Sequence, residues 1–344
     1  MAATPRPTMT DVAAAAGVSR ALVSIVIRGA TGASEATRAR VLAAAADLGY
    51  RRDTRARLLR SSRTAMLGVA FNVTEPYQAE LVELLYEAAE LAGYGITLSA
   101  TGPRRSEQQA IESLLDLGAE ALILLSPETP EEVLAALGLP VVSLLHPLRA
   151  GAVGSVSTDE AAGISLAMEH LRSLGHHRIA HIDGGSAVGS AARRQAYLEF
   201  MHLQGWGPSA AVVSGGPSEA DGSRAARELL DGARRPGAEP HTAVVVFNDR
   251  CALGVLDVFG KTGLSVPGDI SVVGYDNSRL ARLGHINLTS IGQDGAQLAA
   301  RAVQAAVSRI DGGPVVHEVV APYLEPGGTT AAPQCEPPGG PAIP

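Results

Sequence analysis

Arginine is the residue type whose number and position in this chain most clearly suggest chemistry. Residues 1–63 hold eleven arginines and four acids, a net charge of +7, whereas the rest carries −14 within an overall charge of −7. Guanidinium groups bind phosphate through paired hydrogen bonds. A small basic segment joined to an acidic body is therefore typical of a protein whose smaller part contacts nucleic acid. A solvated helical surface would carry the same charge, so the local pattern has to decide.

The sequence contains no clear motif for nucleotide binding, metal binding or catalysis. The stretch Gly184–Ser190 is glycine-rich after an apolar run, but no lysine follows it and it does not fit G-x-G-x-x-G. Cys251 and Cys335 form neither a disulfide framework nor a zinc-ligand pattern. Because no Ser–His–acid set or metal-ligand spacing stands out, we expect no catalytic residues, no metal, no cofactor and no enzyme activity.

Composition limits the class of protein further. The chain has 344 residues, 46% of them hydrophobic, which is room for two or three domains with a stable core. No apolar run reaches the ~18 residues of a membrane span, and the proline-rich N-terminus lacks the apolar stretch of a secretory signal. We therefore expect a cytoplasmic protein without a membrane partner.

The basic segment has the pattern of three short helices. Thr8 and Asp11 form a capping-box start, Gly17 ends that helix, and Ser19 is suited to cap a second one over residues 20–27. Two helices around a short glycine-containing turn predict a helix-turn-helix. A third helix is expected from Ser34 to residue 48, with an apolar face that packs on the first two. That face is expected to contain Val41, Leu42, Ala45 and Leu48.

The stretch TMTDVAAAAGVSRALVSIVIRG…SEATRARVLAAAADLGY resembles the headpiece of the LacI/GalR (lactose-repressor/galactose-repressor) transcription factors. The resemblance implies that the second helix reads bases in the major groove through Arg20, Ala21 and Ile25. Arginine at the first position is suited to guanine, whereas alanine and isoleucine offer only apolar contact. Isoleucine at the third position departs from many relatives. The expected phosphate contacts or helix caps are Thr8, Ser19, Ser24, Arg28 and Thr37.

Residues 51–63 resemble the hinge helix of the same family. The resemblance implies that Leu59, with Ala56 beside it and Arg55 nearby, wedges into the minor groove. A flexible basic linker is the alternative, and the family's usual proline near Arg52 is missing.

Residues 64–330 alternate aliphatic runs with amphipathic stretches, which predicts an α/β architecture with parallel sheets. So many units in this length suit two sheets better than one. Expected strands are 66–71, 96–100, 121–125, 141–145, 178–182, 211–213, 243–247 and 270–274, and expected helices include 79–91, 107–117, 160–174 and 250–262.

The resemblance continues through EHLRSLGHHRIAHIDG, FNDRCALGVLDVFGKTGLSVPGDISVVGYDN and TSIGQD, and implies a two-lobed core like the periplasmic binding proteins. The expected domains are a disordered tail (1–7), the headpiece (8–50), the hinge (51–63), the effector-binding and dimerisation core (64–330) and a second disordered tail (331–344). Within the core, the first lobe is expected near 64–160 and 293–320, and the second near 161–292 and 321–330.

In that family the effector lies between the lobes at the carboxyl ends of strands. Arg193, Asn248, Asp249, Asp276 and Gln293 match its pocket-lining pattern. From the first lobe we add the loop that begins at Asn72, with Tyr77 to stack on a sugar, and the strand ends Ser126 and His146. For Tyr77, Ser126 and His146, an ordinary loop role is about as plausible as effector binding.

Two positions depart from many relatives. Pro217 stands where an aromatic residue is usual, and His146 or Leu145 where others have an acid or glycine. The effector is therefore expected to differ from a common hexose, or to be absent.

These observations predict a transcriptional regulator that binds a pseudo-palindromic operator in double-stranded DNA as a homodimer, and they favour a repressor over an activator. A sugar-like small molecule in the cleft would control it. The alternatives are a ligand-binding protein of the same lobed fold without operator control, including a transport protein, and a nucleotide enzyme. The first leaves the basic headpiece unexplained, and the second lacks a phosphate-binding loop.

Overall fold

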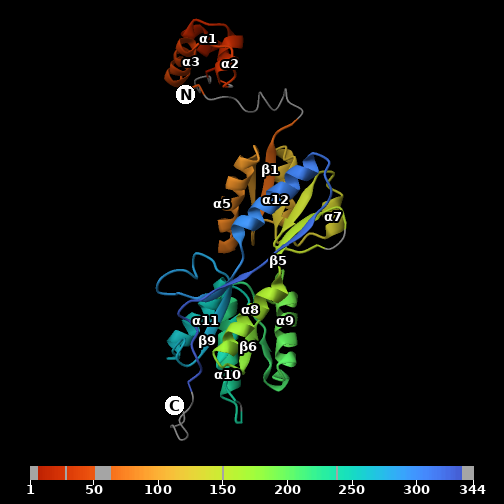
Figure 1. The fold of residues 1–344 in the computed structure, drawn as a ribbon, viewed down its shortest axis with the longest axis vertical. Coiled ribbons are helices and arrows are strands. Elements are labelled where there is room, and N and C mark those ends of the chain that lie inside the picture. Colours follow the sequence, from red (N-terminus) through yellow and green to blue (C-terminus); the bar gives the residue numbers. More distant parts are fainter. Residues whose placement is uncertain (1–6, 28, 51–62, 149–150, 238, 335–344) are drawn as a thin grey trace. The chain divides into compact units, whose positions relative to one another are not determined.

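The computed structural model describes residues 7–27, 29–50, 63–148, 151–237 and 239–334. Contacts divide the chain into two compact units, Met1–Thr64 and Ala65–Pro344 (Figure 1). Among the described residues no single helix is long and apolar enough to cross a membrane, although the bent pair α1–α2 together would meet that length and composition test.

The first unit contains α1 (Met9–Ala16), α2 (Arg20–Ile27) and α3 (Glu35–Asp47). Thr8 and Asp11 form the expected capping box, and Gly17 ends α1 with φ 63°, a conformation that suits glycine. The axes of α1 and α2 bend by 103°, within the range of a helix-turn-helix. The core of this unit gathers Val12, Ala13, Ala16, Val23, Val26, Val41 and Ala45.

The predicted packing face of α3 was partly wrong. Val41 and Ala45 are buried, whereas Leu42 is 50% exposed and Leu48 is 37% exposed. Leu42 directly follows Val41, and adjacent helical residues point about 100° apart, so both cannot face α1 and α2.

The second unit contains two six-stranded sheets. The first has the order β11-β5-β4-β3-β1-β2 and is parallel throughout. The second has the order β12-β10-β9-β8-β6-β7 and is parallel except for the pair β10–β12. The first sheet consists of β1 (Met66–Asn72), β2 (Gly95–Thr101), β3 (Ala121–Leu125), β4 (Val141–Leu144), β5 (Gly154–Thr158) and β11 (His317–Val320). The second consists of β6 (Ile179–Ile182), β7 (Ala211–Val213), β8 (Ala243–Val246), β9 (Ser271–Asp276), β10 (Thr289–Gly292) and β12 (Tyr323–Glu325).

Helices cover both faces of each sheet, which explains why central strands such as β3 and β8 are buried at every residue. On the first sheet, α5 (Pro76–Leu91) and α12 (Gly295–Ile310) share one apolar cluster and lie side by side in Figure 1. On the opposite face pack α6 (Glu107–Asp116) and α7 (Glu131–Ala135). On the second sheet, α8 (Glu160–Ser173) and α9 (Ser190–Leu203) share one cluster, and α10 (Glu219–Ala233) and α11 (Asp249–Lys261) share another. A short 3₁₀ turn, Gly207–Ser209, follows α9.

Each sheet with its helices forms one lobe, and the chain crosses between the lobes after β5, after β10 and after β11. Hydrogen bonds tie these crossings together. Thr158 Oγ1 donates to Gln293 Oε1 over 2.6 Å, and Asp159 N donates to Val320 O over 3.2 Å. The predicted fold class, an all-α headpiece followed by a two-lobed core with parallel sheets, is confirmed.

Part of the expected C-terminal tail has fixed contacts. Ala331 N donates to Ser271 Oγ, and Ala331 O lies 2.8 Å from His176 Nε2. The expectation of disorder from residue 331 onward was therefore wrong at this residue. Residues 335–344 lie outside the described residues.

Candidate functional site

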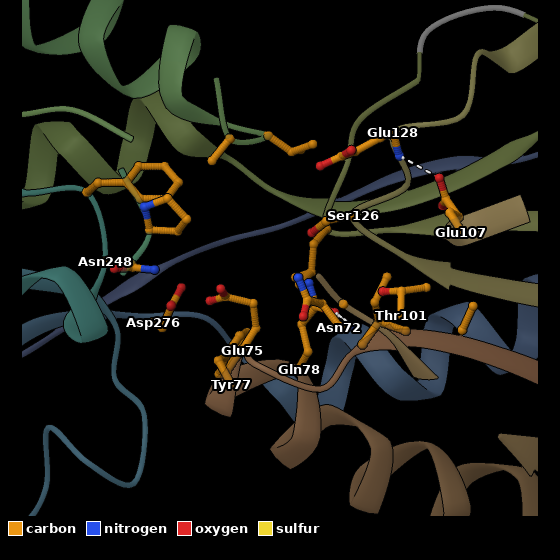
Figure 2. A pocket seen from close by; sticks show the side chains of 18 of the residues that line it. Asn72, Glu75, Tyr77, Gln78, Thr101, Glu107, Ser126, Glu128, Asn248 and Asp276 are labelled. Atoms are coloured by element: carbon orange, nitrogen blue, oxygen red, sulfur yellow. Dashed lines mark hydrogen bonds between the residues drawn. The ribbon is translucent and has the colours of Figure 1, made fainter. Parts of the chain in front are cut away.

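A cavity of about 440 Å³ lies between the two lobes of the second unit (Figure 2). Figure 2 shows Asn248 and Asp276 of the second lobe facing Asn72, Glu75 and Ser126 of the first. Its lining residues are Ala70, Asn72, Glu75, Tyr77, Gln78, Thr101, Gly102, Arg105, Ser106, Glu107, Leu125, Ser126, Glu128, Leu145, Glu160, Ala187, Val188, Arg193, Pro217, Phe247, Asn248, Asp276 and Gln293.

The carboxyl ends of parallel strands supply much of this lining. Asn72 ends β1, Thr101 ends β2, Leu125 ends β3 and Asp276 ends β9. Parallel strands of a sheet end at one edge, so side chains just past them converge there. Ser126, Leu145 and Asp276 also have positive φ values of 49°, 72° and 106°. Non-glycine residues are rarely held in that region outside functional sites.

Arg193 lines the cavity, but an internal partner already holds its guanidinium. Arg193 Nε donates to Glu160 Oε2 over 2.6 Å and Nη2 donates to Oε1 over 3.2 Å, while Nη1 donates to Phe247 O. The guanidinium also lies 3.5 Å from the centre of the Tyr275 ring. Burial acts to lower the pKa of Arg193, but the interactions with Glu160, Tyr275 and Asp276 together raise it above its usual value.

Asp276 and Gln293 form the polar centre of the cavity. Gln293 Nε2 donates to Asp276 Oδ1 over 2.8 Å, and Gln293 Oε1 accepts from Thr158. Burial raises the pKa of Asp276 well above its usual range, although Arg193 opposes the shift. Asp276 is therefore suited to donate or accept hydrogen bonds with a neutral hydroxyl-bearing ligand.

Asp249 is not among the lining residues. It is 1% exposed, and its carboxylate accepts hydrogen bonds from Ser278 N and Ser290 Oγ, each over 2.6 Å. Burial raises its pKa to about 6, against the lowering effect of those bonds. Asp249 therefore fixes the segment that follows Asp276, a role different from the predicted effector contact.

Two further predicted contacts differ in detail. His146 is absent from the lining, and its Nδ1 lies 2.9 Å from Pro127 O; Leu145, which directly follows β4, lines the cavity instead. Tyr77 lines the cavity, but it is 9% exposed and its hydroxyl donates to Gln293 O. Little of its ring face is left for stacking on a sugar.

Seven of the nine predicted effector contacts therefore line the cavity, and the lining residues that were not predicted include Thr101, Arg105, Glu107, Glu128 and Glu160. Thr101 directly follows a predicted strand, so its position was a usable signal. The sequence gave no signal for Glu160, because an acidic residue in the first turn of a helix is common.

The acids of the lining outnumber its bases. The lining contains five acids, Glu75, Glu107, Glu128, Glu160 and Asp276, and two arginines, Arg105 and Arg193. Arg105 Nη2 donates hydrogen bonds to the hydroxyl groups of Ser99 and Ser113, so its guanidinium is held within the first lobe. Among the described residues no group of three or more His, Cys, Asp or Glu side chains is placed to hold a metal ion.

The headpiece presents a second candidate site on α2. Arg20 and Ala21 are exposed at its N-terminus, and Ser24 and Ile25 are half-buried. Thr8, Ser19 and Thr37 take part in helix caps: Thr8 with Asp11, Ser19 Oγ accepting from Leu22 N, and Thr37 with Ser34. Arg28, Arg55, Ala56 and Leu59 lie outside the described residues.

Two protein-family models match parts of this chain. The model "Bacterial regulatory proteins, lacI family" matches residues 8–53, and "Periplasmic binding protein-like domain" matches residues 168–330. The transcriptional regulator GalR of Escherichia coli K12 is 31% identical over 326 residues, which cover 92% of this chain and 94% of that protein.

Two solved structures extend the likeness. The lac repressor dimer bound to operator and the anti-inducer ONPF has a TM-score of 0.79 and 27% identity, covering 95% of this chain and all of that one. The regulator CelR in complex with cellobiose has a TM-score of 0.67 and 30% identity, covering 94% of this chain and all of that one. This chain belongs to the LacI/GalR family of bacterial helix-turn-helix transcriptional regulators.

Proposed function

We propose that the protein is a homodimeric repressor that binds a pseudo-palindromic operator and is controlled by a sugar-like effector between its lobes. One observation carries the proposal: a single chain joins a basic helix-turn-helix, with Arg20 exposed at the start of α2, to a two-lobed unit with a polar cavity. Effector binding would shift the lobes and change DNA affinity. A coupling of ~1–3 kcal/mol between the sites gives a 5–150-fold switch.

Base reading is assigned to Arg20, with apolar contacts from Ala21 and Ile25. Exposure of Arg20 at the N-terminus of α2 supports this, because that end of a recognition helix enters the major groove. Phosphate contacts are assigned to the cap regions of Thr8, Ser19, Ser24 and Thr37, together with Arg28. The hinge wedge by Ala56 and Leu59, flanked by Arg55, remains part of the proposal.

The effector is proposed to be an uncharged polyol. Asn248, Asp276 and Gln293 supply amide and carboxyl groups, which bind neighbouring hydroxyls. Glu107 and Glu128 have no ion-pair partner among the described residues, and their negative charge in the lining disfavours phosphates and carboxylates by repulsion. The lac repressor structure with operator and the CelR structure with cellobiose support the DNA and sugar parts of this proposal.

The DNA proposal predicts a selective effect of Arg20→Ala. After an operator is selected from a random duplex library, this variant is expected to bind it about 5–150-fold more weakly for each half-site, because each bidentate arginine–guanine contact is worth ~1–3 kcal/mol. Affinity for unrelated duplex should fall much less, as fluorescence anisotropy will report. Arg40→Ala, which removes an equally exposed arginine of α3, is the charge-matched control. Equal losses by Arg20→Ala on both duplexes would refute base reading.

The effector proposal predicts a ligand-induced rise in melting temperature. A thermal-shift panel of neutral saccharides, including cellobiose and ribose, is expected to contain at least one that stabilises the wild type, because binding to the folded state adds to its stability. Asp276→Asn should reduce that shift, whereas Asp116→Asn in α6, away from the lining, should retain it. A full shift in Asp276→Asn would place the ligand elsewhere. Operator binding that no panel member changes would favour a protein without effector control.

A further inference from the structure

A cluster of ion pairs joins the two lobes beside the cavity. Its acids are Glu75, Glu80 and Glu83, from α5 and the loop before it in the first lobe. Its arginines are Arg250, Arg279 and Arg282, from α11 and the loop after β9 in the second lobe. Each ion pair between these acids and these arginines crosses from one lobe to the other, with the negative charges on the first lobe and the positive charges on the second.

Glu80 is the central acid. Its side chain is only 15% exposed, and it contacts two arginines. Glu80 Oε1 accepts from Arg279 N over 2.8 Å, and Oε2 lies 3.2 Å from Arg282 Nη2. Since a backbone amide is one of the donors, the contact fixes the path of the second lobe's loop as well as its side chains.

Arg282 links this cluster to the cavity. Its Nη2 contacts Glu80, while its Nη1 donates to the carbonyl oxygen of Asn277, the residue directly after Asp276. Asp276 and Asn277 both have positive φ, at 106° and 50°, so this turn depends on outside support. Asp249 supports it from within the second lobe through Ser278 N, and Arg282 supports it with a partner in the first lobe.

We propose that Glu80 and Arg282 form a clasp that holds the two lobes closed and positions Asp276 for its ligand. Opening of the lobes would separate Glu80 from Arg282 and leave the Asp276–Asn277 turn with support from its own lobe only. Cleft closure and the shape of the effector site are thereby linked through one guanidinium. The positioning of a ligand by Asp276 rests on the proposed function, whereas the closure itself does not.

Closure can be measured without any ligand. Leu117→Cys in the first lobe and Leu203→Cys in the second, 58% and 80% exposed, accept spin labels for double electron–electron resonance. Cys335 is replaced by serine. Cys251 is buried, and burial raises its thiol pKa to about 12, so it stays unlabelled.

In this labelled chain, Glu80→Gln is expected to lengthen and broaden the distance between the labels at 0.05 M NaCl. Raising the salt to 1 M should do the same to the wild type and add little in Glu80→Gln, because the exposed parts of the cluster are screened. Arg282→Gln should also lengthen the distance between the labels, and Arg282→Lys, which keeps the positive charge, should lengthen it less. Asp231→Asn, which removes an exposed pair with Arg234 within the second lobe, should leave the distance unchanged.

Identical distance distributions for wild type and Glu80→Gln at both salt concentrations would overturn the clasp. With cellobiose as probe, the clasp predicts about threefold to tenfold weaker binding by Glu80→Gln. If cellobiose binds the wild type and this variant equally, the positioning of Asp276 by Arg282 is refuted. A failure of cellobiose to bind at all would count against the proposed ligand and leave the distance measurement to decide the clasp.

Discussion

The ion pair between Arg193 and Glu160 could not be predicted from the residue types in the sequence. The arginine was expected to bind ligand hydroxyls because it matches a family pattern, yet its guanidinium is held by a carboxylate 33 residues earlier. Such a partner depends on how α8 and α9 pack, and nothing in the local sequence around Glu160 marks it. By contrast, Asn248 directly follows a predicted strand and Asp276 lies two residues after another, so their place at the sheet edge was predictable. Gln293 was placed by the family resemblance alone, because the strand before it, β10, was not predicted.

The buried pair predicts a large cost for Glu160→Gln. Both side chains are less than one-tenth exposed, so the variant leaves a buried guanidinium without its counter-charge. We expect the free energy of unfolding to fall by about 3 kcal/mol, as measured by urea denaturation of the full chain. Glu169→Gln, which breaks an exposed pair with Arg172 in the same helix, should lower the free energy of unfolding far less, because solvent screens that pair. Equal effects of the two variants would contradict the role given to burial.

At the scale of elements, capped helices were predicted best and short polar strands worst. The bounds of α2 and β3 match the prediction, and α1 begins and ends at the predicted caps. The strands β5, β10, β11 and β12 were missed, since GSVST, TSIG, HEVV and YLE are too short and polar for a strand pattern. They form because a neighbouring strand already offers hydrogen-bonding groups, which is a tertiary cause.

The C-terminal end of α2 provides an element-scale prediction. Arg38 of α3 donates to Val26 O in the last turn of α2 and to Ala30 O in the loop that follows, and basic side chains commonly stabilise a helix C-terminus in this way. Arg38→Ala is therefore expected to fray α2 and to lower headpiece stability by about 1 kcal/mol. Hydrogen exchange at the amides of Gly29 and Ala30, which bond back to α2, should accelerate about fivefold. Arg40→Ala is the control, and unchanged exchange in Arg38→Ala would remove the capping role.

At the scale of the whole molecule, the charge partition was readable from sequence and coincides with a structural division. The basic segment, residues 1–63, falls within the unit Met1–Thr64, and the acidic remainder forms the unit Ala65–Pro344. The alternation of apolar runs also predicted two sheets. The crossing of ion pairs between lobes was beyond prediction, because each of those residues looks like ordinary helix or loop surface in sequence.

This partition predicts how salt acts on DNA binding. The overall net charge of −7 includes a segment, residues 1–63, with a charge of +7. DNA binding should therefore depend on the counterions that this segment alone displaces from the DNA. The logarithm of affinity for operator should fall linearly with the logarithm of NaCl concentration, by about 0.9 for each phosphate contacted. For a dimer with six or more such contacts, the loss between 50 and 200 mM is on the order of a thousandfold. Residues 65–344 alone, at −14, should show no affinity for duplex at any of these concentrations. If the affinity of the full chain did not change with salt, or if residues 65–344 bound duplex as tightly as the full chain, electrostatic DNA binding by the first unit would be refuted.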